Sequence, residues 1–187
     1  MILAYNITTT NGRIEISNLT IDQSSFRSSN GRITATSINT DYRLEFNTTN
    51  GNINLQSITS DRIETRTSNG NLDLTAVNAS QINGRTTNGS ITLNNVTAMD
   101  SVNASTSNGR INLTNLISND IRLTTSNGRV SGSILGNVDD FQKELRTSRG
   151  EIVLNNRRHG RSLIDSTVRE KQLFVRTSNG SIDLDIR

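Results

Sequence analysis

Aliphatic side chains recur along this chain at fixed distances from a repeated Asn-Gly step. Three residues after the Asn of each step lies Ile, Leu or Val. Two residues further on comes a second aliphatic in most copies, and the residues between them are mostly polar. Period-two alternation of this kind predicts a strand with one buried face. A third aliphatic lies eight residues after the Asn, at Leu19, Ile38, Ile58, Val77, Val96, Leu116 and Leu135.

The residues that precede each step alternate in the same way. Thr or Ser lies two residues before the Asn, and apolar side chains are frequent four and six residues before it. Each unit therefore predicts a strand, a corner, a second strand, a short third segment and a polar turn. Asp side chains, which bond readily to their own backbone, mark that turn in several units, at Asp22, Asp41, Asp61, Asp100 and Asp120.

The step itself sets the period of the repeat. Its Asn residues are Asn11, Asn30, Asn50, Asn69, Asn88, Asn108, Asn127 and Asn179, and Arg149-Gly150 occupies a ninth place. The first seven are 19 or 20 residues apart, after which the spacing widens to 22 and then 30. Repeats of this length are typical of stacked architectures.

Two architectures agree with the pattern. Asn-Gly between alternating runs is a strong hairpin signal and would give an antiparallel meander. A β-solenoid is favoured instead, because the whole unit, connectors included, keeps a nearly constant length, whereas the loops of a meander vary freely. We therefore expect an all-β, single-domain β-solenoid of about nine stacked coils over residues 1–187.

Stacking has a direct consequence for side chains at equal positions in the repeat. Successive coils lie about 4.8 Å apart, so the eight Asn residues of the steps should form a structural ladder of side-chain amides. The Thr residues two positions earlier should form an inward column, with Ile91 stacked on Ile111 in another wall. These Thr residues include Thr67, Thr86, Thr106 and Thr125.

Two stretches interrupt the repeat, near residues 134–147 and 155–172. The first is compatible with a helical turn, and the second carries Arg157, Arg158, His159 and Arg161. Insertions in repeat proteins form loops, and loops often carry function. The second stretch is therefore a candidate binding loop, with shielding of an open sheet edge as the alternative.

Composition narrows the class of protein further. Hydrophobic residues make up 31% and aromatic residues 3% of the chain, values low enough to raise the question of disorder. A net charge of only +3 and the strict periodicity argue for an ordered stack. Pro and Cys are absent, which suits an uninterrupted ladder and excludes disulfides and thiolate metal sites. No secretory signal or membrane-length apolar run is present, and the chain begins and ends in mid-repeat, so we expect an excised domain.

Catalytic and metal chemistry find little support. His159 is the only His, which argues against a transition-metal site and a Ser-His-Asp triad. Glycoside chemistry needs paired carboxylates, and Asp73 and Asp183 share a repeat position but lie several coils apart. We expect no enzyme activity, no catalytic residues, no metal and no cofactor.

Arginine recurs at two positions beside the corner, directly after the Gly and three residues before the Asn. Both positions should point outward, so stacking would align them in a broken basic row that attracts anionic polymers or a membrane surface. Nucleic acid is disfavoured, because stacking aromatics are nearly absent. The alternative is a set of Arg residues that keep the surface soluble, partly paired with Glu15, Glu45 and Glu64. The candidate binding residues, which we call the arginine edge, are Arg13, Arg32, Arg66, Arg85, Arg110 and Arg129.

The recurrent Thr-Ser-Asn-Gly-x-Ile-x-Leu, seen at 67–74, 106–113, 125–130 and 177–184, resembles the adhesin-like DUF4097 family, also called toastrack domains. The likeness spans essentially the whole chain. It implies a β-helical stack and a cell-surface or envelope setting, and it supplies no catalytic residues.

The leading functional hypothesis is a non-enzymatic, adhesin-like surface module, a stiff scaffold or weak binder of glycan or anionic polymer. A regulatory module that senses envelope stress beside a membrane-anchored partner is the alternative, and a polysaccharide-active β-helix enzyme is a second one.

Overall fold

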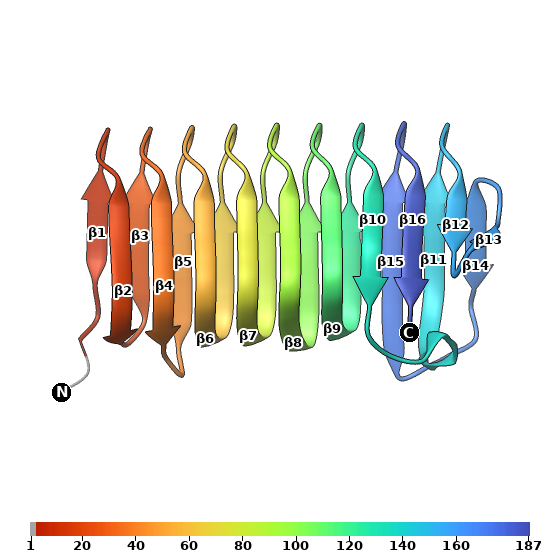
Figure 1. The fold of residues 1–187 in the computed structure, drawn as a ribbon, viewed down its shortest axis with the longest axis horizontal. Coiled ribbons are helices and arrows are strands. Elements are labelled where there is room, and N and C mark those ends of the chain that lie inside the picture. Colours follow the sequence, from red (N-terminus) through yellow and green to blue (C-terminus); the bar gives the residue numbers. More distant parts are fainter. Residues whose placement is uncertain (1–2) are drawn as a thin grey trace.

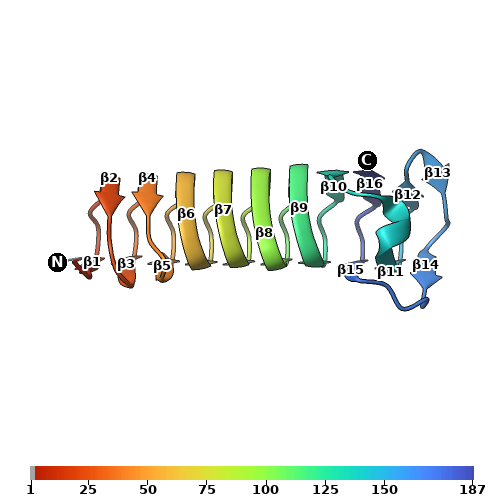
Figure 2. The same cartoon turned by 90° about the horizontal axis from the view of Figure 1, so that it is seen from below.

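The protein is described by a computed structural model covering residues 3–187. It is a straight rod in which coils follow one another along the long axis, with the Asn-Gly corners aligned along one edge (Figure 1). The view from below shows two layers of strands facing each other (Figure 2). We call the layer that runs toward the corners the ascending layer and the layer that leaves them the descending layer.

The elements follow the chain from coil to coil, and β6 to β9 each run through both layers. They are β1 (Asn6–Thr9), β2 (Ile14–Thr20), β3 (Ser24–Ser28), β4 (Ile33–Asn39), β5 (Arg43–Asn47), β6 (Ile53–Arg66), β7 (Leu72–Arg85), β8 (Ile91–Ser105), β9 (Ile111–Thr124), β10 (Val130–Ile134), a 3-10 turn η1 (Val138–Asp140), β11 (Phe141–Thr147), β12 (Ile152–Leu154), β13 (Arg157–Arg158), β14 (Ser162–Asp165), β15 (Lys171–Thr177) and β16 (Ile182–Ile186).

Neighbouring coils pair in parallel and in the register that the repeat predicts. Ile53 lies beside Leu72, Leu72 beside Ile91 and Ile91 beside Ile111, and all four side chains are fully buried. The meander is therefore wrong, because it required antiparallel pairing across the corners. The β-solenoid is confirmed, including the stacked wall of Ile91 and Ile111.

The short third segment depends on one left-handed residue in each coil. Seven residues after the Asn, the backbone adopts a φ of 51 to 56° at Asn18, Ser37, Ser57, Ala76, Asn95 and Asn115. This bend turns the third aliphatic into the core. The seventh coil replaces the bend with a bulge near Gly132, so Ile134, and not the predicted Leu135, pairs with Leu116 and is buried.

In the first two coils the polar turn separates two strands, β2 from β3 and β4 from β5. From β6 to β9 the strand continues through the turn as one element of 14 or 15 residues. Small buried side chains at this bend, such as Ala79 beside Ala98, keep successive coils in contact there.

The corners stack more closely than any side chain would permit. A Cβ added to any corner Gly from Gly31 onward would lie 1.7–2.1 Å from the carbonyl oxygen of the Gly stacked on it. The Thr two residues before each Asn uses this proximity. Thr86 Oγ1 accepts from Gly89 N at 3.2 Å and donates to Gly70 O at 2.9 Å in the preceding coil. The predicted inward Thr column is confirmed, but its hydroxyls bond to glycine backbone and not to one another.

Chain order is exchanged at the C-terminal end. β15 lies between β9 and β11, and β16 lies between β10 and β12. The last segment of the chain thus inserts between the coil of Asn127 and the coil of Arg149. Seven coils stack in chain order, and the uniform stack of nine is corrected accordingly. The repeat alone could not predict the exchange, because the two last coils share the Thr before the corner, the corner Gly and the Ile and Leu that follow it.

The two predicted insertions have different outcomes. In residues 134–147 the irregular part is limited to the 3-10 turn and its flanks, because β11 is a regular strand of the stack. In residues 155–172, β13 pairs antiparallel with β12 and β14 pairs antiparallel with β11. This second stretch covers the last parallel strands, as the shielding alternative predicted.

Candidate functional site

The corner carries a continuous ladder of side-chain amides. Each Asn Nδ2 donates to the Oδ1 of the Asn in the preceding coil at 2.6–2.7 Å, from Asn30 through Asn127, and Asn179 extends the ladder by bonding to Asn127. The predicted ladder of Asn11, Asn30, Asn50, Asn69, Asn88, Asn108, Asn127 and Asn179 is confirmed. It fixes the spacing of whatever side chains flank the corner.

One row of the arginine edge lies on the outer face of the ascending layer. Arg66 and Arg85 are direct neighbours in register, and both are exposed. Asn47 precedes them in this row and Ser105 follows them. The row therefore has a compact positive centre between uncharged residues.

The second row lies on the other side of the ladder, where the chain leaves the corner. Arg13 and Arg32 occupy adjacent coils, as do Arg110 and Arg129, and all four are exposed. Asn and Ser occupy this place in the three coils between the two pairs. The arginine edge is thus three clusters of two residues on two sides of the amide ladder, and not one unbroken row.

Ion pairs divide the arginine edge into two classes. Arg129 pairs with Asp183, and Arg13 lies 3.8 Å from Glu15. Within residues 3–187, no carboxylate lies within ion-pair distance of Arg32, Arg66, Arg85 or Arg110. Four guanidinium groups therefore keep their full charge available to a partner.

Arg43 is a charged group that sequence analysis missed. Its Nη2 lies 2.7 Å from the Glu64 carboxylate and 3.5 Å from the Glu45 carboxylate. Glu45 also accepts a hydrogen bond from Arg27 at 2.9 Å. Desolvation raises the pKa of Glu45, but hydrogen bonds from Arg27 and Asn47 and the two positive charges outweigh it, so its pKa lies below the ordinary value. The repeat pattern does not single out Arg43, because its two carboxylate partners come from its own strand and from the next coil.

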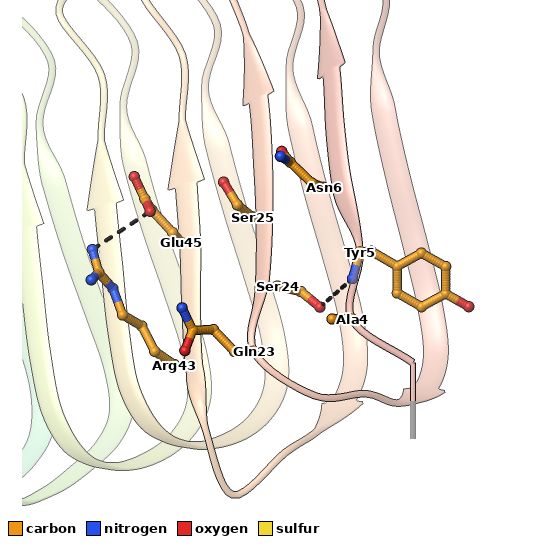
Figure 3. A pocket seen from close by; sticks show the side chains of 8 residues that line it. All are labelled: Ala4, Tyr5, Asn6, Gln23, Ser24, Ser25, Arg43 and Glu45. Atoms are coloured by element: carbon orange, nitrogen blue, oxygen red, sulfur yellow. Dashed lines mark hydrogen bonds and ion pairs between the residues drawn. The ribbon is translucent and has the colours of Figure 1, made fainter. Parts of the chain in front are cut away.

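A shallow depression of about 230 Å³ opens near this cluster at the N-terminal end of the ascending layer (Figure 3). Asn6, Gln23, Ser25, Arg43 and Glu45 contribute polar groups to it. The Tyr5 ring points away from these side chains, while Tyr5 N donates to Ser24 Oγ at 2.9 Å.

The loop candidates lie within the C-terminal cap. Arg157 and Arg158 form β13, and Arg158 pairs with Glu151 at 3.4 Å. The backbone N–H of His159 donates to Ile152 O at 2.9 Å, and Thr147 N donates to Arg161 O at 3.0 Å. Their backbones thus hold the cap, while a binding role for their side chains stays a prediction.

A buried lysine completes the cap, and sequence reasoning missed it as well. Lys143 occupies a core position stacked on Leu173 and is 8% exposed. Its Nζ donates to Val138 O at 2.9 Å and Phe141 O at 2.8 Å and lies 3.2 Å from Asp165. Hydrogen bonds from Thr167, with a further one from Lys143, lower the pKa of Asp165 to about 2.

The acidic residues considered for glycoside chemistry stay apart. Asp73, Thr92, Asn112, Ser131 and Asp183 follow one another in a single column, so three coils separate the two carboxylates. Across residues 3–187, no group of three or more His, Asp or Glu side chains is placed to hold a metal ion.

Comparison with known proteins gives one match. The family model described as Toastrack DUF4097 matches residues 56–187, which is more than half of the chain. No curated protein and no solved structure gives a significant match. Within the described residues, no helix is long and apolar enough to cross a membrane.

Proposed function

The chain belongs to the Toastrack DUF4097 family, and from that premise we propose that it is a stiff, non-enzymatic module of a cell surface or envelope that binds anionic polymers along its arginine edge. The β-solenoid itself fits a structural module. Binding of a polymer and the absence of catalysis are the parts that experiment must establish.

The unpaired arginines carry this proposal. Arg66 and Arg85 stand side by side at the strand spacing of about 4.8 Å. Like charges directly opposite each other on neighbouring strands destabilise a sheet. Within residues 3–187, no carboxylate lies within ion-pair distance of either guanidinium group, and an anionic polymer lying along the rod would supply that contact.

The rigidity of the corner supports the same conclusion. The amide ladder and the Thr–Gly bonds hold the arginine backbones at fixed intervals along the rod. A binding surface that is already ordered loses little conformational entropy when a partner arrives. Several weak contacts can therefore sum to measurable affinity.

The test replaces Arg66, Arg85 and Arg110 together with Gln and measures binding to heparin, used as a polyanion probe. An exposed ion pair contributes about 0.2–1 kcal/mol, so the loss of three should weaken binding roughly tenfold. The parent affinity should fall steeply as salt rises toward physiological strength, where the Debye length is about 8 Å.

The matched control replaces Arg157, Arg161 and Arg169 with Gln, which removes the same net charge from the cap region. Binding should survive in this variant. If both triple variants lose affinity equally, net charge and not the arginine edge is responsible. If only the cap variant loses it, the site is the loop. A parent protein that does not bind heparin at low salt refutes the proposal.

A further inference from the structure

One aromatic side chain faces outward in the C-terminal part of the ascending layer. On β15, the buried Leu173 and Val175 point into the core, so Phe174 between them points out and is half-buried. Polar residues occupy the same column in the central coils, at Glu64, Asn83 and Asn103. Packing of the core does not account for an aromatic ring here.

The chain exchange gives Phe174 its neighbours. In register across four strands, Arg122 on β9 lies beside Phe174, Phe174 beside Glu144 on β11, and Glu144 beside Ile164 on β14. Ile164 is 53% exposed. An aromatic ring and an aliphatic side chain therefore flank a carboxylate on one flat surface.

Polar side chains complete the surface on its side away from the corners. Gln172 and Gln142 are adjacent in register, and Arg122 Nη2 donates to Gln172 Oε1 at 3.2 Å. Together with Phe174, Glu144 and Ile164 these residues line a depression of about 180 Å³. Apolar contact area with a few convergent polar groups is the usual composition of a small-ligand site.

The charges in this depression are already matched within the protein. Arg122 Nε lies 3.2 Å from Asp120, Glu144 lies 2.8 Å from Arg146, and Asp165 pairs with Lys143. A polyanion gains little here, unlike at the arginine edge. The two Gln amides both donate and accept, and Glu144 accepts, which suits a ligand rich in hydroxyl groups.

We infer that this depression, which we call the Phe174 site, binds a neutral sugar ring of a glycan. The C–H face of a pyranose packs on the Phe174 ring, and its hydroxyls bond to Gln142, Gln172 and Glu144. This inference is independent of the arginine edge, because it requires no net charge.

The test uses saturation-transfer difference NMR with cellotetraose and chitotetraose as probes, at a salt concentration that suppresses polyanion binding. A single shallow site predicts a Kd on the order of 1 mM. Phe174→Thr retains strand propensity and should weaken binding by roughly two- to tenfold, because it removes the aromatic contact with the sugar ring. Phe174→Tyr keeps the ring and should restore binding.

The control variant is Tyr42→Thr, which removes another exposed aromatic ring from the turn before β5. It should bind as the parent does, and circular dichroism should show all three variants folded. The inference is overturned if the parent binds neither probe, or if Phe174→Thr binds as tightly as the parent. Loss of heparin binding in the arginine variants with retained oligosaccharide binding separates the two sites.

Discussion

The close stacking of the corner glycines offers the sharpest test of the fold. In Gly89→Ala, the new Cβ would lie 1.8 Å from Gly70 O and 2.4 Å from Gly70 C. Backbone atoms cannot yield as a flexible side chain does, so the two coils must separate by more than 1 Å at the corner, given that Cβ contacts shorter than 3.0 Å essentially never occur.

The cost follows from the hydrogen bonds that span this interface. Asn88 Nδ2 donates to Asn69 Oδ1 at 2.7 Å, Thr86 Oγ1 to Gly70 O at 2.9 Å, and the backbone N–H groups of Thr87 and Asn88 to Ser68 O at 3.2 and 2.9 Å. Each bond contributes about 1 kcal/mol net, so their loss costs about 4 kcal/mol. That is a large share of the 5–15 kcal/mol typical of a folded domain.

Gly84→Ala makes the same chemical change in the same coil and serves as the control. Its Cβ would meet nothing closer than Thr65 Oγ1 at 3.3 Å. Gly within a strand costs about 0.5–1 kcal/mol relative to Ala, and the tight contact with Thr65 offsets part of that gain, so this variant should stay within about 1 kcal/mol of the parent. Urea unfolding followed by far-UV circular dichroism compares the two. Equal stability of Gly89→Ala and Gly84→Ala would refute the role assigned to the corner glycines.

Two further predictions concern single side chains. Thr86→Val leaves Gly89 N and Gly70 O buried without their hydroxyl partner and should lower the free energy of unfolding in urea by about 2–4 kcal/mol. Thr65→Val removes a buried hydroxyl that has no hydrogen-bond partner, so it should be neutral or stabilising. The opposite order of stabilities would contradict the role assigned to the Thr column. The pKa of Asp165 is lowered from 3.8 to about 2, so its stabilising effect is fully present above the ordinary value and is lost as pH falls through about 2. The melting temperature of Asp165→Asn should lie below that of the parent at neutral pH and converge with it near pH 2. A difference in melting temperature that stays constant with pH would show that the carboxylate charge does not stabilise the cap.

The repeat predicted the interior of the rod because the same local pattern of buried and exposed side chains recurs in each coil. The Asn-Gly period sets the register, the alternation decides which side chains are buried, and the Thr column follows from both. The Asn-Gly step is a hairpin signal in sequence, but Gly is needed at the corners of this fold for a different reason. Corner glycines are needed for close stacking of coils, which no property of a single unit reveals.

Features that depend on which coils are neighbours escaped prediction. Thr147 and Thr177 occupy the same position in the repeat, as do Ile152 and Ile182, so the sequence could not show that the latter coil lies inside the former. Outward placement of the arginines was predictable, and so was the partial pairing of surface arginines with Glu15, Glu45 and Glu64, but the partner of Arg129 was not. Arg129 is neutralised by Asp183, 54 residues away, only because of the exchange. The Phe174 site is invisible in the sequence for the same reason.

The exchange also bears on how the rod assembles from a growing chain. Through the first seven coils, each ladder bond joins residues 16 to 20 apart, so each coil can form as soon as its sequence is available. At the seventh coil this separation jumps to 49–54 residues, as in Thr177 to Gly128 and Asn179 to Asn127. Closing a loop costs only about 0.6 kcal/mol more per doubling of its length, so the thermodynamic penalty is small.

The kinetic consequence is larger. The coil of Arg149 is synthesised before the coil of Asn179 on which it must rest, so until residues 171–187 are made its only native neighbours among the described strands are β13 and β14 of the cap. Stacking in chain order from the N-terminal coils can therefore reach β10 but cannot continue until residues 171–187 are available. A ribosome-bound chain that lacks residues 171–187 would leave the edges of β9 and β10 without their parallel partners β15 and β16, so this segment joins the cap to the coils made before it.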